Sequence, residues 1–452
     1  MSSDSRALIS GARPIHASSG AVYGFETGRR RIVFLVFVVY TLLILEGALR
    51  KWVFPEYQQA LFFIRDPFVL LIYLYATVYA IRPRGWAFQS GIVLAVCALI
   101  LIPIQLIFTD APLLVLLYGW RNYFFYVPLA FVIGETFQSE DLDRMARFTL
   151  LLAVPIAVLV YIQFLSLPEA FINKAVTDDA LVFVVVEDVV RTTGTFSFTA
   201  GQSLFVGSIF AMMLSCWTAR PEARPVGGAI LIVVSVAVIA NLALSGSRTA
   251  FIVCALVVLM TPVVAMRMEG WKALRALLWP SVVVSVGIVI FVYLFDASFD
   301  AINERRISAD EEQDLVQRAL DGFYAFTDDL LDVPILGHGI GLGTNAGAVI
   351  AIGASEFRLG EHENSRIIQE CGAIFGSAYI FYRLALFLHL AIGALKATRR
   401  TQNPLPIYLI GFIGIYILQG QMTFQGTTNG YGWLFIGFCL AANGMQNKTS
   451  HP

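Results

Sequence analysis

Residues 32–49 read IVFLVFVVYTLLILEGAL, with Glu46 as the one charged side chain in the run. A helix that crosses a bilayer needs about 20 predominantly apolar residues, and this run is close to that length. Over the whole chain of 452 residues, 58% are hydrophobic and 14% are charged, whereas soluble proteins carry about 25% charged residues. The sequence therefore predicts an integral membrane protein.

Similar apolar runs follow along the rest of the chain. They predict an all-α, polytopic helical bundle of about twelve transmembrane helices, at 32–49, 61–80, 91–109, 112–134, 148–167, 201–218, 226–244, 249–266, 278–295, 371–395, 405–424 and 429–444. Residues 1–28 are expected to form a disordered tail, 29–444 the membrane domain, and 445–452 a second short tail. No small-residue cleavage site precedes the first span, so we expect a retained helix rather than a signal peptide.

The distribution of lysine and arginine predicts the orientation of the spans. With a cytoplasmic N-terminus, most basic residues of the short loops fall inside, among them Arg82, Arg144, Arg220 and Lys396. Both termini are then cytoplasmic, and the longer polar segments 168–200 and 296–370 lie outside. A long loop in a compact fold is usually functional, and residues 311–326 have the spacing of a short amphipathic helix.

Several charged side chains fall inside the expected spans, where each costs about 2.5–3.5 kcal/mol and is usually paired or functional. Arg65 and Asp66 adjoin in sequence and point in different directions on a helix, so each needs another partner. Arg383 is expected near the middle of the bilayer. If its role is structural, we expect it to form an ion pair between helices, with Glu46 or Glu370 as the partner.

A set of basic residues is expected at one depth, in the outer half of the membrane. Its members are Arg50, Lys51, Arg65, Arg121, Arg191, Arg248 and Arg366. Arginine stays charged, and its planar guanidinium binds phosphate oxygens in a bidentate manner. This distribution suits a lipid-linked phosphate or diphosphate.

Four short motifs stand out in the second half of the chain. They read RTTGTFSF at 191–198, LSGSRTA at 244–250, PILGHGIGLG at 334–343 and EHENSRIIQECG at 361–372. In this combination and order they resemble the O-antigen ligase and Wzy-type polysaccharide polymerase superfamily of bacterial membrane glycosyltransferases. The resemblance covers about residues 185–445; the earlier spans match only in hydropathy.

The resemblance implies sugar transfer from an undecaprenyl-diphosphate-linked glycan to an acceptor hydroxyl, on the outer face of the bacterial inner (cytoplasmic) membrane. Such a reaction needs a base for the acceptor proton and positive charge for the departing diphosphate. His362 is the natural base; Glu361 and Glu363 flank it and either orient it or replace it. The resemblance assigns the diphosphate to Arg191 and Arg248, and depth and position add two further candidates, Arg121 and Arg366.

Glu363 separates His362 from Asn364, whereas in the family the histidine is usually followed directly by asparagine. This difference favours a polymerase-like branch that builds exopolysaccharide, with other polysaccharide assembly proteins as partners. Two alternatives stay open. The chain could be a ligase that transfers finished glycan to a lipid A core, or a flippase or transporter of lipid-linked oligosaccharide.

Other kinds of site are not indicated. The glycine run at 337–343 follows no strand and lies in no βαβ unit, so it does not predict a nucleotide site. The five cysteines are scattered and form no Cys-x-x-Cys pair, and we expect neither a metal ion nor another cofactor. A net charge of −1 also argues against a nucleic-acid partner.

Overall fold

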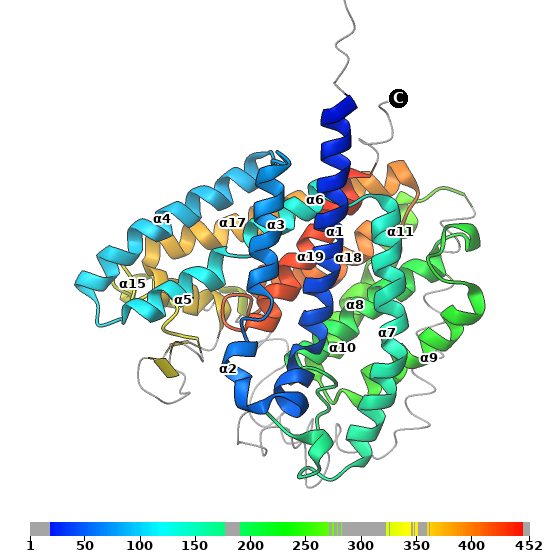
Figure 1. The fold of residues 1–452 in the computed structure, drawn as a ribbon, viewed down its shortest axis with the longest axis horizontal. Helices are drawn as coiled ribbons and strands as arrows, with labels where there is room; N and C mark the ends of the chain where they lie inside the picture. Colours follow the sequence, from blue (N-terminus) through cyan, green and yellow to red (C-terminus); the bar gives the residue numbers. More distant parts are fainter. Residues whose placement is uncertain are drawn as a thin grey trace, which may run out of the picture.

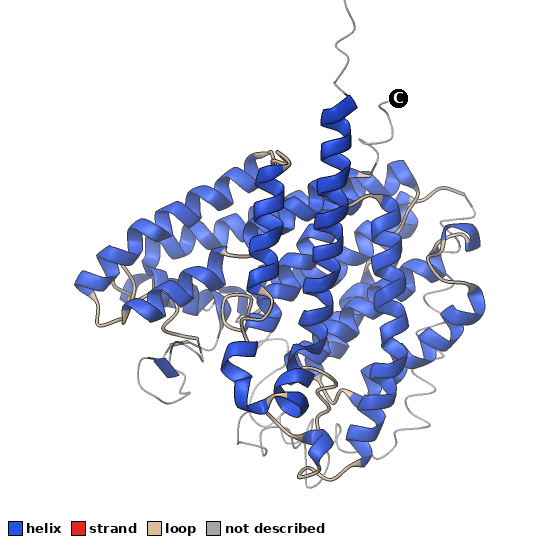
Figure 2. Ribbon diagram, viewed as in Figure 1, coloured by secondary structure: helices blue, strands red, loops and turns tan. Residues whose placement is uncertain are grey.

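The structure, a computed structural model, describes residues 19–176, 190–270, 322–324, 326–344, 359–360 and 362–445, together with a few single positions between them. Within this part of the chain the secondary structure is helical and contains no strand (Figure 2). Among the described residues, seven helical segments are long and apolar enough to cross a membrane. The prediction of a helical membrane protein is therefore confirmed, while the count of twelve spans stays a prediction.

The first half of the described chain is a series of helices joined by short turns (Figure 1). They are α1 (Ser19–Ala48), the π-helical turn η1 (Leu49–Val53), η2 (Pro55–Tyr57), α2 (Gln58–Leu61), α3 (Asp66–Val78), α4 (Trp86–Phe108), α5 (Leu113–Phe124), α6 (Val127–Thr136), α7 (Ser139–Leu165) and η3 (Phe171–Asn173). Helix α1 already begins at Ser19, inside the tail expected over 1–28.

The second half continues in the same way. Its helices are α8 (Thr199–Thr218), η5 (Pro221–Ala223), α9 (Gly228–Leu244), α10 (Arg248–Leu259), α11 (Thr261–Arg267), α15 (Phe326–Asp332), α17 (Glu363–Thr401), α18 (Leu405–Gln419) and α19 (Gly426–Gly444). Helix α17 begins within the segment expected as the outer loop 296–370. Most of the span expected at 278–295, residues 296–321 of that loop and the tail 446–452 lie outside the described residues.

The centre of the bundle consists of α8, α18 and α19, and α3 and α4 lie at its periphery (Figure 1). Small residues let the central helices approach closely. A Cβ atom on Gly437 would lie 2.8 Å from Ile133 of α6, and one on Gly207 would lie 2.8 Å from Phe412 of α18. Lipid gives no hydrophobic drive between helices, so close packing of this kind is a main source of their association.

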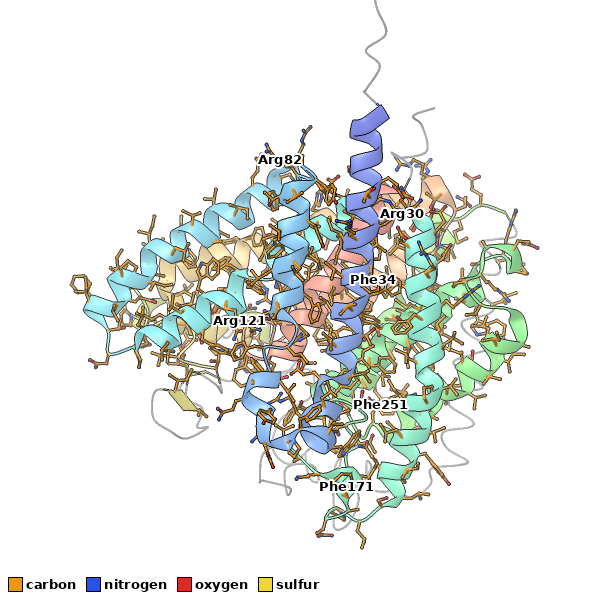
Figure 3. All side chains as sticks on the ribbon, in the orientation of Figure 1. Arg30, Phe34, Arg82, Arg121, Phe171 and Phe251 are labelled. Carbon is orange, nitrogen blue, oxygen red and sulfur yellow. The ribbon has the colours of Figure 1, made fainter. Side chains whose placement is uncertain are left out.

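At one end of the bundle, α7 contacts both α1 and the segment before α9. Arg29 of α1 forms an ion pair with Asp141 of α7, and Arg147 of α7 donates to the carbonyl of Pro225, just before α9. Figure 3 shows Arg30 and Arg82 at this end and Phe171 at the other. This grouping agrees with the alternation expected for the basic loops; which side of the membrane the end faces stays a prediction.

Candidate active site

Helix α17 reverses direction inside the fourth motif. Straight helix rises about 1.5 Å per residue, so 20 residues would separate Glu363 from Arg383 by about 30 Å, yet their side chains lie 3.0 Å apart. The reversal falls at Gly372, whose φ of 81° and ψ of 166° are not helical. The motif residues before Gly372 therefore form a separate short arm that folds back against the membrane-spanning arm.

The third motif wraps around this break. A Cβ on Gly372 would lie 1.9 Å from the carbonyl oxygen of Ile335, and a Cβ on Gly337 would lie 2.4 Å from the nitrogen of Gly372. The two backbones touch directly, and Gly337 also has a positive φ, of 71°. These glycines thus serve close backbone packing between the third and fourth motifs.

The carboxylate of Glu370 holds the glycine-rich turn. It accepts hydrogen bonds from the backbone nitrogens of Gly341 (3.0 Å) and Gly343 (2.9 Å) and from the hydroxyl of Tyr123 (2.8 Å). Gln105 of α4 adds a bond from its amide to the carbonyl of Leu336 at 2.6 Å. Backbone donors that would be needed to bind a nucleotide phosphate are therefore occupied by the protein itself.

A buried charge network lies directly after His362. Glu363 forms ion pairs with Arg366 and with Arg383, and it accepts hydrogen bonds from the backbone nitrogen (2.9 Å) and hydroxyl (3.1 Å) of Thr423. The expected partners of Arg383, Glu46 and Glu370, are wrong, because the reversal at Gly372 brings Glu363 to it instead.

Arg366 is the central cation of this network. Its guanidinium is completely buried, stacks 4.6 Å from the ring centre of Phe424, and has Nε 4.0 Å from Glu370. Nε and Nη1 make no hydrogen bond to any residue that the structure describes. Buried polar groups are normally hydrogen-bonded, so these donors mark a place with capacity for a further anion or water.

His362 occupies the N-cap position of α17 and is half-buried. Its carbonyl accepts the backbone nitrogen of Arg366 at 2.9 Å, while its imidazole is not hydrogen-bonded to another described residue. Glu361 lies outside the described residues. His362 therefore directly precedes the network in the chain, and the carboxylate of Glu363 is already engaged.

A second buried network connects α1, α3 and α5. Glu46 contacts Arg50 at 3.2 Å and Arg65 at 2.9 Å, and Asp66 binds Arg121 through two bonds of 2.7 Å each. Tyr126 also donates to Asp66, at 2.8 Å. The expectation that Arg65 and Asp66 have separate partners is confirmed, and Arg121 is committed to Asp66.

The first and second motifs pack against each other. Thr192 donates to the carbonyl of Leu244 at 2.8 Å, which ties the segment after Arg191 to the serine-arginine corner. At that corner Ser247 bonds to Ser203 at 2.8 Å. Arg248 is exposed at the start of α10, and Arg191 is half-buried.

The turn η1, which follows α1, supports the first motif from the other side. Lys51, which is buried, donates to the hydroxyl of Thr193 (2.9 Å) and the carbonyl of Gly194 (3.0 Å). Arg50 donates to Ser197 at 3.3 Å. Arg50 and Lys51, which the sequence predicts at the same depth as Arg191, therefore hold the first motif in place.

The loop between α18 and α19, residues 420–425, joins the two networks. Arg65 donates to the carbonyl of Gly426 at 3.1 Å, Asn122 donates to the carbonyl of Thr423 at 3.2 Å, and Phe424 stacks on Arg366. Contacts thus run from the first motif through Arg50, Glu46 and Arg65 to Gly426, and the adjoining loop continues them through Thr423 to Glu363. Lys51 adds a second contact to the first motif. We call this continuous set of contacts the polar band.

The structure therefore brings the four motifs together in pairs, and the polar band links the pairs. Sequence reasoning did not assign a role to Thr423, Gln105 or Asn122, although a glutamine in the apolar run of α4 was a visible signal. The described residues contain no group of three or more His, Cys, Asp or Glu side chains that could hold a metal ion.

The arrangement places buried arginines on and against the helix that begins after His362, and its assignment as a site rests on this geometry and on the motifs. No family model matches the chain, and no curated protein matches it in sequence.

Proposed function

We propose that the chain is a bacterial inner-membrane glycosyltransferase that polymerises undecaprenyl-diphosphate-linked repeat units into a surface polysaccharide. The observation that carries this proposal is the polar band, which connects the arginine motifs to the helix that His362 caps. A lipid-linked diphosphate needs buried cations at membrane depth, and the acceptor needs a base beside them.

In the proposed reaction His362 takes the proton of the acceptor hydroxyl, and the acceptor oxygen attacks the anomeric carbon of the donor sugar. The bond between that carbon and the diphosphate oxygen breaks, and the diphosphate leaves with its electron pair on the lipid carrier. Arg191 and Arg248 bind the leaving anion as its charge develops, and the proton on His362 is released when product departs.

The geometry favours a division of roles among the remaining candidates. Glu363 is saturated by Arg366, Arg383 and Thr423, so it anchors the network and leaves His362 as the base. Arg121 is held in a bidentate pair by Asp66 and serves to position the band. Arg366, with two nitrogens that lack hydrogen-bond partners among described residues, supplies positive potential one helical turn after His362.

The activity is tested with purified full-length chain and lipid-linked repeat units, without nucleotide or added metal. We expect longer lipid-linked chains, resolved by gel electrophoresis. His362→Ala should reduce elongation by about 10²–10⁴-fold, because it removes the proposed base. Arg248→Gln should reduce it by about 10²-fold or more, because a charge contact to the leaving group is lost.

His338→Ala and Arg220→Gln are the matched controls: both side chains are exposed, outside the polar band, and should leave elongation unchanged. Normal elongation by both His362→Ala and Arg248→Gln would overturn the site. Chains that stay short on the carrier while finished glycan moves to a lipid A core would instead identify a ligase.

A second function, transport of the same lipid-linked glycan, is favoured by one observation. Helices are interrupted at Gly372 in α17 and between α5 and α6 at Phe125, and transporters commonly bind substrate at broken helices. Proteoliposomes distinguish the two: movement of intact repeat units across the bilayer with no increase in glycan length would support transport and contradict polymerisation.

A further inference from the structure

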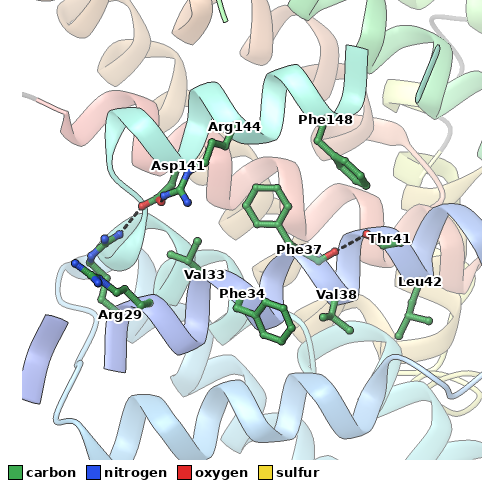
Figure 4. Close-up of a pocket in the computed structure, with 11 residues that line it drawn as sticks. Arg29, Val33, Phe34, Phe37, Val38, Thr41, Leu42, Asp141, Arg144 and Phe148 are labelled. Carbon is green, nitrogen blue, oxygen red and sulfur yellow. Dashed lines mark hydrogen bonds and ion pairs between the residues drawn. The ribbon is translucent and has the colours of Figure 1, made fainter. Parts of the chain in front are cut away.

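A groove between α1 and α7 begins at the end of the bundle where Arg29 lies and extends along α1 to Leu42. Its volume is about 840 Å³, and its lining is contributed by the two helices. Figure 4 shows Arg29 and Arg144 beside Asp141 at one end, with Phe37 and Phe148 further along. The groove is therefore charged at one end and apolar over the rest of its length.

The apolar part has the length of one leaflet. From Val33 to Leu42 the helix rises about 14 Å, against about 15 Å for half of the hydrocarbon core. Phe34 is 67% exposed in this part, and Val38, Thr41 and Leu42 continue the same lining. A ligand that fills it must be an extended apolar chain.

The charged end is basic and open. The lining holds three arginines and one carboxylate, and the side chains of Arg30 and Arg144 are 76% and 64% exposed. Glu26 pairs with both Arg29 and Arg30, and Asp141 pairs with both Arg29 and Arg144, so three arginines share two carboxylates and one positive charge remains. Because Arg29 is buried, Arg30 and Arg144 are the groups that can approach a ligand. Their position selects an anionic headgroup.

We propose that this groove binds one anionic phospholipid, with its headgroup at Arg30 and Arg144 and an acyl chain along Phe34, Val38 and Leu42. Charge complementarity and the one-leaflet length both favour a lipid over a second protein helix, which would need an apolar surface on both halves. The proposal does not depend on the proposed function.

The test is native mass spectrometry of the full-length chain in detergent, titrated with phosphatidylglycerol or phosphatidylcholine. Each arginine beside an anionic lipid contributes about fivefold in affinity, and partial pairing with Glu26 and Asp141 reduces this. We expect about a tenfold preference for phosphatidylglycerol. The double variant Arg30→Gln with Arg144→Gln should lose the preference, whereas the control Arg82→Gln with Arg220→Gln should keep it.

A second variant probes the apolar part without touching a charge. Val38→Trp fills the groove and should weaken binding of both lipids by about tenfold, while Leu70→Trp, on an exposed face of α3, should not. Equal phosphatidylglycerol binding by the two arginine double variants, or by the two tryptophan variants, would overturn the proposal. The proposal would also be overturned if free glycerol phosphate displaced the lipid. The same holds if Val38→Trp abolished a dimer of the chain and left lipid binding intact.

Discussion

Glu363 receives more buried contacts than any other carboxylate of the polar band, from Arg366, Arg383 and Thr423. A buried ion pair is a weak source of stability, because desolvation of both charges offsets their attraction. Removal of one partner is nevertheless costly, since it leaves the other charge buried without compensation. Loss of the Glu363 carboxylate would remove an ion-pair partner from two buried arginines, Arg366 and Arg383.

Glu363→Gln should therefore lower the free energy of unfolding by about 3–5 kcal/mol, although glutamine keeps an oxygen for Thr423. The measurement is thermal unfolding of the detergent-purified chain, followed by tryptophan fluorescence. Glu222→Gln, at an exposed position of the short turn η5, is the control and should keep the melting temperature of the unaltered chain. Equal melting temperatures for the two variants would show that the network does not hold the fold.

The helix reversal at Gly372 acts at the scale of an element. It converts one stretch of helix into a short arm that carries the motif residues and a long arm that crosses the membrane. The glycine-rich turn fits against the reversal, and Glu370 and Gln105 hold it there. The position of His362 thus depends on backbone contact between two distant motifs.

Gly372→Ala should disrupt this contact. A backbone with positive φ and ψ near 166° is adopted essentially by glycine alone and costs about 1–3 kcal/mol for a residue with a side chain. The overlap of the new Cβ with Ile335 adds to that cost. We expect a lower melting temperature and faster hydrogen exchange over 335–344, measured by mass spectrometry. In Gly228→Ala the new methyl meets open space, so that variant should match the unaltered chain, and no difference between the two would contradict the assignment.

At the scale of the whole molecule, the bundle has two unlike ends. Arg30 and Arg82 lie at one end and Phe171 at the other (Figure 3). Positive charge in short loops is retained on the cytoplasmic side, so the basic end is expected to face inward and the polar band outward.

Cysteine labelling tests this orientation in a chain whose native cysteines are replaced by serine. Phe171→Cys should react with a membrane-impermeant maleimide in intact spheroplasts, because the positive-inside rule places its loop outside. Arg82→Cys should react only after the membrane is opened. The reverse pattern would place the polar band in the cytoplasm and contradict the proposed chemistry.

The sequence by itself determined the class of the protein, because apolar runs of spanning length and a low charge content leave no soluble alternative. It also indicated that Arg65 and Asp66 need separate partners, since helix periodicity fixes the directions of adjacent residues. It could not predict that Arg383 binds Glu363, because that contact depends on a chain reversal whose only local signal is one glycine.

Tertiary structure alone decided which motifs touch. Thr192 meets Leu244 and Gly337 meets Gly372 because loops fold against helices that are far apart from them in sequence, and such contacts have no local signature. The role of Thr423 is of the same kind: a loop threonine becomes part of a buried network only because α18 and α19 bring it to Glu363. Periodicity fixes which face of a helix is apolar, but the partner of that face depends on the packing of the whole bundle.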